Sequence, residues 1–150
     1  MNKKLRILMT VDPEIPVPPP YYGGIERIVY MLVCALKERG HDLHLFAGQG
    51  SKVPVSFIPY EGKSSKSYMD TIKNALQIRK YVNQLRHVDI VHSFGRLAYL
   101  LPLMKLRFPK IQSYQRYITP RSVRWGNRLA GKSLTFVACS RSCARTANFE

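Results

Sequence analysis

Two adjacent glycines, Gly23 and Gly24, stand directly before an apolar run with helical spacing. The loop before them, from Asp12 to Tyr22, is rich in proline, which fixes φ and limits the conformations that are lost on ordering. Glycine lets a backbone pass close to a ligand, and a helix N-terminus presents unpaired N–H groups. This pattern predicts an anion site, with a simple tight turn as the alternative. Glu26, in the first helical turn, is expected to complement the helix dipole.

Three further polar residues follow the ends of expected strands. His92 ends one strand, where a neutral imidazole can bond a ligand hydroxyl or orient an acceptor. Arg96 and Arg116 lie beyond strand ends, where they can contact phosphate or acceptor. A histidine satisfied by neighbouring backbone, and arginines that are solvated or salt-bridged, remain the alternatives.

The sequence lacks the residue patterns that several other kinds of chemistry require. The nine acidic residues are not clustered, which argues against hydrolysis by paired carboxylates. The two glycines are neither a GxGxxG motif nor a Walker loop. The three cysteines show no metal-type spacing and no paired framework, so no metal site is expected and a reducing compartment fits best.

The segment "RSVRWGNRLAGK" is strongly basic. If it is helical, Arg121, Arg124 and Arg128 lie along one face with Trp125 beside them. Such a face suits anionic headgroups, with the indole at the interface. An ordinary solvated helix face is the alternative, and Gly126 is expected to weaken the helix.

The elements that position these residues follow from the hydrophobic pattern. Short apolar runs alternate with helical periods over the whole chain, so we expect an α/β sandwich with a mostly parallel sheet. Ligands then bind beyond the carboxyl ends of the strands. Strands are expected at Leu5–Val11, Asp42–Ala47, Val55–Pro59, Val88–Phe94, Lys110–Tyr114 and Leu134–Ser140, and helices from Ile25 to Gly40, Ser67 to Arg86, Leu97 to Leu106, Arg121 to Leu129 and onward from Ser142.

The 150 residues and their 45% hydrophobic content indicate one folded domain. The formal net charge is +15, and the excess lies after Tyr60, where 17 Lys and Arg face 4 acidic residues. Anionic lipid, nucleic acid and phosphorylated small molecules all suit such a charge. No stretch approaches 18 apolar residues and no signal sequence is recognisable, so a cytoplasmic protein is expected.

The motifs in their order resemble those of one enzyme family. "ILMTVDPEIPVPPPYYGGIERIVYMLVCALKERGHDLHLFA" is similar to the start of the N-terminal Rossmann-like domain of GT-B glycosyltransferases, the retaining enzymes grouped as family 4. "DIVHSFGR", "PKIQSYQR" and "FVACSRSCA" resemble the ends of the family's later strands. The resemblance covers nearly the whole chain, and it implies a Rossmann-like three-layer sandwich, the N-terminal half of a GT-B fold.

The resemblance also implies a reaction. Such enzymes transfer a sugar from a nucleotide-diphosphate donor to an acceptor with retention, without an obligatory metal or other cofactor. Gly23 and Gly24 match the family's glycine loop near the donor diphosphate. Relatives often have HxH where this chain has His92 and Phe94, so the role of the second histidine does not transfer. The N-terminal domain contributes the acceptor side, and a C-terminal domain holds most of the donor.

Two functions from different classes follow. The first is the acceptor-side domain of a nucleotide-sugar-dependent transferase, which is catalytically incomplete without a C-terminal donor domain. Residues 1–150 are then a fragment of a longer enzyme, a deliberately shortened form of it, or the product of a truncated gene that binds without catalysing. The second is a non-catalytic module that uses its basic part on an anionic membrane, with nucleic acid the weaker partner. In either case contact with the inner membrane surface is open.

Overall fold

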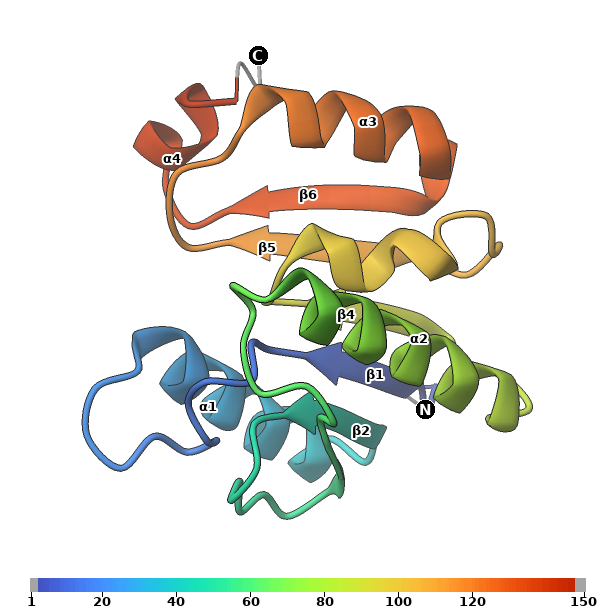
Figure 1. Cartoon of the computed structure of the whole chain (residues 1–150). Helices are drawn as coiled ribbons and strands as arrows, with labels where there is room; N and C mark the ends of the chain where they lie inside the picture. The colour runs from blue at the N-terminus through green and yellow to red at the C-terminus, as the bar shows by residue number, and fades with distance from the viewer. Residues whose placement is uncertain (1–2, 148–150) are drawn as a thin grey trace.

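The computed structural model describes residues 3–147. Six parallel strands form one sheet in the order β3-β2-β1-β4-β5-β6 (Figure 1). Their bounds are β1 Arg6–Thr10, β2 Asp42–Ala47, β3 Ser56–Pro59, β4 Ile90–Ser93, β5 Lys110–Tyr114 and β6 Leu134–Ala138. The order reverses between β1 and β4, which is the switch point where open α/β sheets bind ligands.

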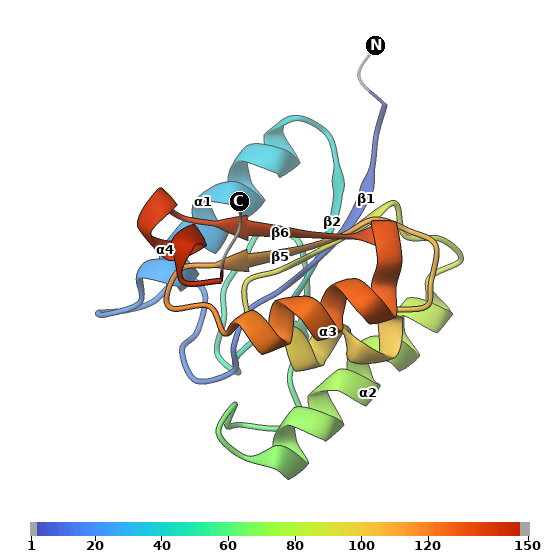
Figure 2. The ribbon, with the colours of Figure 1, turned by 90° about the horizontal axis from the view of Figure 1, so that it is seen from above.

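Helices cover both faces of this sheet, as a parallel sheet requires. Helix α1 (Gly24–Glu38) and the short α4 (Arg141–Arg145) lie on one face. Helices α2 (Tyr68–Gln84) and α3 (Pro120–Ala130) lie on the other, together with the 3₁₀ helix η1 (Leu97–Leu103) (Figure 2). A single 3₁₀ turn, η2 (Gly131–Ser133), joins α3 to β6. The predicted three-layer sandwich with a parallel sheet is confirmed.

Apolar clusters on both faces of the sheet hold the layers together. Under α1, the buried side chains of Met9, Val29 and Leu45 belong to one cluster. On the opposite face, Leu8 and Ile78 belong to the other. Adjacent residues of β1 therefore bury opposite faces, which explains why a buried parallel strand is an unbroken apolar run.

One expected helix differs in type, and the others begin or end a residue or two from the expected positions. The segment expected as a helix from Leu97 to Leu106 is a 3₁₀ helix that ends at Leu103, and Pro102 lies within it. Proline removes a backbone donor, which disfavours a regular α-helix there. The last helix begins at Arg141, one residue earlier than expected, because the Ser140 hydroxyl caps it by accepting the Cys143 N–H at 3.1 Å. Residues 148–150 of that expected helix lie outside the described residues.

Gly126 has a packing role that its helix propensity does not reveal. A Cβ at this position would lie 2.8 Å from Cζ of Phe136 and 3.1 Å from Cδ2 of Leu134. The missing side chain therefore lets α3 lie close against β6. Real Cβ atoms do not approach neighbours at 2.8 Å, so a larger residue here would require the Phe136 ring, the Leu134 side chain or α3 itself to shift.

Candidate functional site

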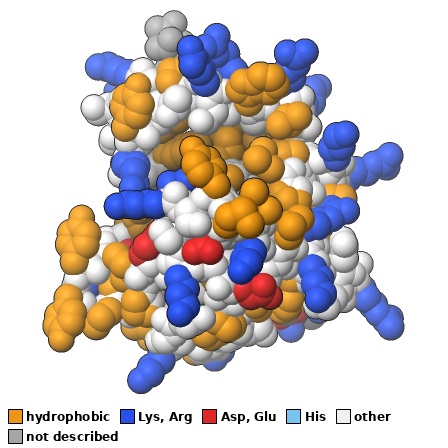
Figure 3. Space-filling model, in the orientation of Figure 1, with side chains coloured by type: hydrophobic (Ala, Val, Ile, Leu, Met, Phe, Trp, Pro, Cys, Tyr) orange, Lys and Arg blue, Asp and Glu red, His pale blue; other side chains and the backbone are white. Residues whose placement is uncertain are grey.

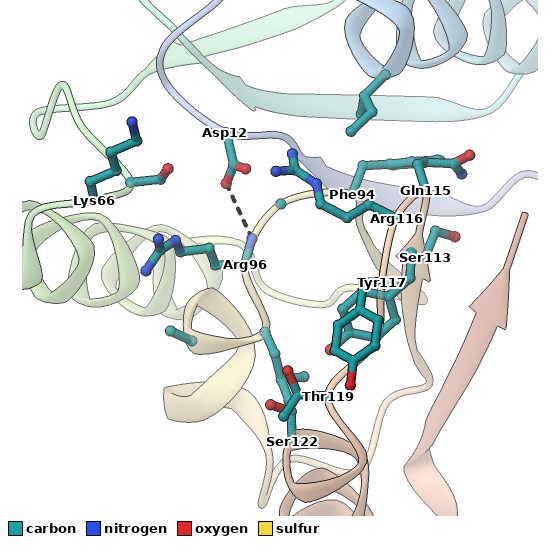
Figure 4. A pocket seen from close by; sticks show the side chains of 16 residues that line it. Asp12, Lys66, Phe94, Arg96, Ser113, Gln115, Arg116, Tyr117, Thr119 and Ser122 are labelled. Atoms are coloured by element: carbon teal, nitrogen blue, oxygen red, sulfur yellow. Dashed lines mark hydrogen bonds between the residues drawn. The ribbon is translucent and has the colours of Figure 1, made fainter. Parts of the chain in front are cut away.

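A cavity of about 520 Å³ opens at the carboxyl edge of the sheet, around the switch point. The segments that follow β1, β4 and β5 line it, together with the loop before α2 and the first turn of α3. Its charged and polar side chains are those of Asp12, Ser65, Lys66, Arg96, Ser113, Gln115, Arg116, Thr119 and Ser122 (Figure 4). We call it the switch-point cavity.

Asp12 is the acidic residue of this cavity. Its Oδ1 accepts the backbone N–H of Arg96 at 3.2 Å, and a Cβ on Gly95 would lie only 2.9 Å from that oxygen. Burial raises the pKa of Asp12 to about 6, and the nearby Glu14 carboxylate contributes to the rise, while Arg116 and Arg96 oppose it. A carboxyl group with this pKa changes protonation near neutral pH and can accept a hydrogen bond from a ligand hydroxyl.

Three cations surround Asp12 in the cavity lining. The guanidinium of Arg116 points toward Asp12, and the side chain of Arg96 extends toward the segment that carries Lys66 (Figure 4). All three are exposed, and within residues 3–147 none of them forms an ion pair. The structure thus places both Arg96 and Arg116 in the lining of one cavity, and their role there stays a prediction.

His92 lies behind Ser113 and Phe94, which form part of the cavity lining. Its Nε2 is 2.8 Å from Oγ of Ser113, and its ring stacks on Phe94 with 4.3 Å between the ring centroids. Burial lowers the pKa of His92 to about 4, so the ring is neutral at physiological pH. Ser113 and Phe94 line the cavity, whereas His92 does not. The imidazole is satisfied by a side-chain hydroxyl rather than by the backbone.

The two glycines lie at the same edge, on a second cavity of about 580 Å³. Ile25, Gln115 and Arg116 line both cavities, so the two adjoin. The proline-rich loop before the glycines is tied to the loop after β2, because the backbone O of Val17 accepts the Lys52 N–H at 2.7 Å. The carbonyl oxygen of Tyr21 accepts a hydrogen bond from Arg27 at 3.2 Å.

Gly23 and Gly24 are glycines for different reasons. Gly23 has a φ of 151°, and a Cβ there would lie 2.6 Å from Cβ of Pro19. The fold itself therefore requires glycine at position 23. Gly24 is the first residue of α1, and a Cβ there would meet nothing within 4 Å. Nothing in the described chain explains its missing side chain, and the space in front of it is open.

The three long helices all begin at this edge, and their third residues differ. In α1 this residue is the buried Glu26, and in α2 it is Asp70. The Asp70 carboxylate also accepts the N–H groups of Lys63 and Ser64, each at 3.1 Å. In α3 it is Ser122, and the first turn of α3 has no acidic residue. Negative charge near a helix N-terminus is stabilising, so α3 alone lacks this compensation from its own side chains.

The basic segment forms the outer surface of α3. Arg121, Arg124 and Arg128 are exposed, and Trp125 is 60% exposed. The guanidinium of Arg128 lies over the Trp125 ring, 5.9 Å from its centroid. The predicted arginine face with an adjacent indole is therefore present, and it points away from the sheet.

Several residues of the switch-point cavity are missing from the candidates that the sequence provides. Asp12 is predicted only as the start of the loop after β1, although a carboxylate at a strand end is a usable signal. Lys66 falls in a segment without an expected element, and only the crossover from β3 to α2 brings it here. Thr119 and Ser122 depend on where α3 begins, one residue earlier than the expected Arg121. Between residues 3 and 147, no three His, Cys, Asp or Glu side chains are grouped to hold a metal ion.

The comparisons with known proteins give one family. The model described as Glycosyltransferase Family 4 matches residues 22–148, which include α1, the glycines and most of the cavity lining. A search of curated proteins found no match. The match covers far more than half of the chain, and its parallel α/β sandwich is that of half a GT-B fold. The chain therefore belongs to glycosyltransferase family 4, as an N-terminal GT-B domain.

Proposed function

We propose that this chain is the acceptor-side domain of a retaining glycosyltransferase that uses a nucleotide-diphosphate sugar. The observation that carries the proposal is Gly24, whose missing side chain leaves open space at the N-terminus of α1. Backbone N–H groups there are free to approach a diphosphate, and the helix dipole favours the charge that develops on the leaving group. The adjoining switch-point cavity then holds the acceptor.

In this proposal each residue has a distinct task. Arg116 lines both cavities and neutralises charge between donor and acceptor. Asp12 accepts the hydrogen bond, and then the proton, of the acceptor hydroxyl, whose oxygen bonds to the anomeric carbon on the face from which the diphosphate departs. The bond from that carbon to the diphosphate breaks, and the nucleoside diphosphate leaves with the electron pair. His92 positions Ser113 through the 2.8 Å contact and does not itself touch the ligand.

We further propose that a C-terminal domain supplies most of the donor contacts. The described cations lie on one side of the diphosphate, whereas electrostatic stabilisation in a water-excluded site requires groups around the developing charge. A downstream E-x7-E segment in the complete reading frame supports this arrangement, and its absence contradicts it.

The donor proposal is tested by titrating the chain with a UDP-sugar or a GDP-sugar and following backbone amide shifts. The amides of Gly23 and Gly24 are expected to shift with saturation. Gly24→Val fills the open space with a side chain and is expected to abolish the shifts of neighbouring amides. Lys37→Val is the control, because it adds the same side chain to an exposed position in the last turn of α1, away from both cavities. Equal loss in both variants, or no shift with either donor, contradicts the proposal.

A second function is favoured by the outer face of the α2, η1 and α3 layer. On α2 and η1, Met69, Ile72, Leu76 and Leu101 are at least half exposed. Figure 3 shows hydrophobic side chains gathered on this side of the molecule with Lys and Arg side chains around them. Exposed apolar side chains rimmed by cations suit the surface of an anionic bilayer. We propose that this layer rests on such a membrane.

No helix of the described part of the chain is long and apolar enough to cross a bilayer, so the contact would be peripheral. Sedimentation with liposomes, with and without anionic lipid, tests it. The chain is expected to sediment only with anionic liposomes, and the Arg121/Arg124/Arg128 triple alanine variant is expected to lose this binding. A Lys3/Lys4/Lys37 triple alanine variant removes the same charge elsewhere and is the control. Binding to nucleic acid that is lost in the same variant, without liposome binding, contradicts the membrane proposal.

A further inference from the structure

We propose that Cys139 and Cys143 are a redox-sensitive thiol pair, which a small disulfide such as oxidised glutathione converts to an intrachain disulfide, and that this oxidation releases the segment that carries Arg116. Cys139 follows β6 directly, and Cys143 lies in α4. Arg116 lines both cavities of the candidate site. The inference goes beyond the proposed function, because it depends on the position of Arg116 and not on the identity of donor or acceptor.

The fold brings the two cysteines to the same place. Ser140 lies between them as the N-cap of α4, and its hydroxyl accepts the Cys143 N–H at 3.1 Å, so the chain turns back at this point. The N–H of Cys139 donates to the carbonyl oxygen of Tyr114 at 3.0 Å, and Sγ of Cys143 lies 3.9 Å from that same oxygen. Both cysteines are therefore at the end of β5, next to the segment that lines the cavities.

The two thiols also interact with each other. Burial raises the pKa of the Cys143 thiol, and a hydrogen bond with the Cys139 side chain contributes to the rise. The Cys143 sulfur therefore keeps its proton at neutral pH and can donate it in a hydrogen bond. A disulfide requires sulfur atoms about 2.0 Å apart and Cβ atoms roughly 3.5–4.5 Å apart. Two side chains that already share a hydrogen bond need only a small rearrangement to meet this requirement.

The two thiols differ in their access to solvent. Cys139 is exposed and Cys143 is buried, so an oxidant in solution meets Cys139 first. The Cys139 thiolate attacks one sulfur of oxidised glutathione, and the first glutathione leaves as a thiolate. Cys143 then gives up its proton, its sulfur attacks the Cys139 sulfur, and the second glutathione leaves. The two electrons and two protons that the pair loses convert one oxidised glutathione to two thiols.

Disulfide formation removes a contact that holds the candidate site. Sγ of Cys143 donates to the carbonyl oxygen of Arg116 at 2.9 Å, and a disulfide sulfur has no hydrogen to donate. A second link joins the same segment to α4, because the Ile118 N–H donates to Oγ1 of Thr146 at 3.1 Å, and this hydroxyl donates to the Cys143 carbonyl oxygen at 2.7 Å. Movement of Cys143 toward Cys139 therefore acts on both links. Oxidation loosens the backbone that positions the Arg116 side chain.

Equilibration of the chain at graded ratios of reduced to oxidised glutathione tests the pair. Free thiols are then blocked, and the denatured chain is digested with trypsin without reductant. Trypsin cuts after Arg141, so the two cysteines leave on separate peptides unless a disulfide joins them. We expect joined peptides that a reductant separates. Thiols that stay free at every ratio, or a mixed disulfide of Cys139 with glutathione beside a free Cys143, overturn the inference.

The effect on the site is measured at backbone amides. In the disulfide form, the amide signals of Arg116 and Tyr117 are expected to shift, and the Ile118 amide is expected to exchange its hydrogen at least tenfold faster. Cys34→Ser should respond to oxidised glutathione as wild type does. Cys139→Ser should show no such response, because Cys143 then has no partner. Identical signals and exchange in the dithiol and disulfide forms of wild type overturn the link to the site.

Two substitutions at Cys143 test the hydrogen bond apart from the oxidation. Cys143→Ser keeps a donor for the Arg116 carbonyl oxygen and is expected to retain the amide signals of the reduced chain. Cys143→Ala has no donor and is expected to move the Arg116 and Tyr117 signals in the same direction as oxidation does. Neither variant can form the disulfide, so oxidised glutathione should change these signals in neither. Equal signals in the two variants overturn the inference.

Discussion

The N-termini of α1 and α3 lie at the same edge of the same sheet, yet the chain treats them differently. At α1 the third residue is the buried Glu26, and Gly23 is locked by the fold at a φ of 151°. At α3 the third residue is Ser122, Pro120 opens the helix and no side chain caps it. The first turn of α1 thus contains an acidic side chain, and the first turn of α3 contains none.

The two helix ends are therefore compensated differently. At α1 the chain supplies the buried Glu26 carboxylate, and the space over Gly24 stays open. At α3 the chain supplies no carboxylate, but Pro120 has no N–H, and the Ser122 N–H donates to the Thr119 carbonyl oxygen at 3.0 Å.

The largest loss of stability is expected from a substitution at the N-terminus of α1. Gly23→Ala forces a side chain into a strained φ and against Pro19, so we expect the free energy of unfolding to fall by about 3 kcal/mol. The Cβ that Gly24→Ala adds meets no atom within 4 Å, so this variant is expected to change the free energy of unfolding by less than about 1 kcal/mol. Urea denaturation measures both. Equal losses would mean that both glycines serve only the fold.

Asp12 lies between the two helix ends, and its raised pKa gives the next effect. Between about pH 4 and 6 the native state binds more protons here than the unfolded state, so this group lowers stability as pH rises. Asp12→Asn is expected to stabilise the chain at pH 7.5 by roughly 1–3 kcal/mol and to have less effect at pH 4.5. Denaturation at both pH values checks this. A variant less stable than wild type at pH 7.5 would assign Asp12 a structural role.

His92 is expected to make stability depend on pH in the opposite direction, over an overlapping range of pH. Its pKa is lowered to about 4, so between about pH 4 and 6.5 the unfolded state binds more protons and stability is lost as pH falls. His92→Gln stays neutral and can still bond Ser113. At pH 7.5 the variant serves as the reference. At pH 4.5 its free energy of unfolding, relative to that of wild type, is expected to be roughly 1–3 kcal/mol more favourable than at pH 7.5. The same pH dependence in both proteins would show that the imidazole is protonated in the fold.

The smallest effect is expected when an acidic third residue is added to α3 and removed from α1. Ser122→Asp gives α3 the acidic third residue of α1, and we expect it to raise the thermal midpoint with a gain of about 0.3–1 kcal/mol. Glu26→Gln removes the acid from α1 and is expected to lose a similar amount. Ser56→Asp, at an exposed position of the strand β3 away from the described cavities, controls for added negative charge on this basic chain. A destabilised Ser122→Asp would mean that α3 is already compensated.

Much of the fold is predictable because apolar spacing determines it. Leu5–Val11 and Asp42–Ala47 are short apolar runs bounded by turn residues, and both are strands at nearly those bounds. The helix expected over Leu97–Leu106 is wrong in type, because spacing does not distinguish a 3₁₀ helix from an α-helix when Pro102 lies inside it. Local pattern decides whether an element exists, and backbone hydrogen bonding decides its kind.

The site is less predictable because it depends on long-range placement. Arg96 and Arg116 follow strand ends, and the parallel sheet alone brings them to one edge. Lys66 arrives through a crossover, and the contrast between Glu26 and Ser122 has meaning only once α1 and α3 are known to begin at the same edge. The low pKa of His92 comes from burial, which a strand-end position does not indicate.

Gly126 also affects the shape of the switch-point cavity, although it lies in the packing between α3 and β6. It lies one helical turn beyond Ser122, on the side of α3 that touches Phe136. A methyl group added there would require the Phe136 ring or α3 itself to shift, and a shift of α3 would move Thr119 and Ser122 relative to the rest of the cavity lining. The shape of the switch-point cavity thus depends on a glycine that is not part of its lining.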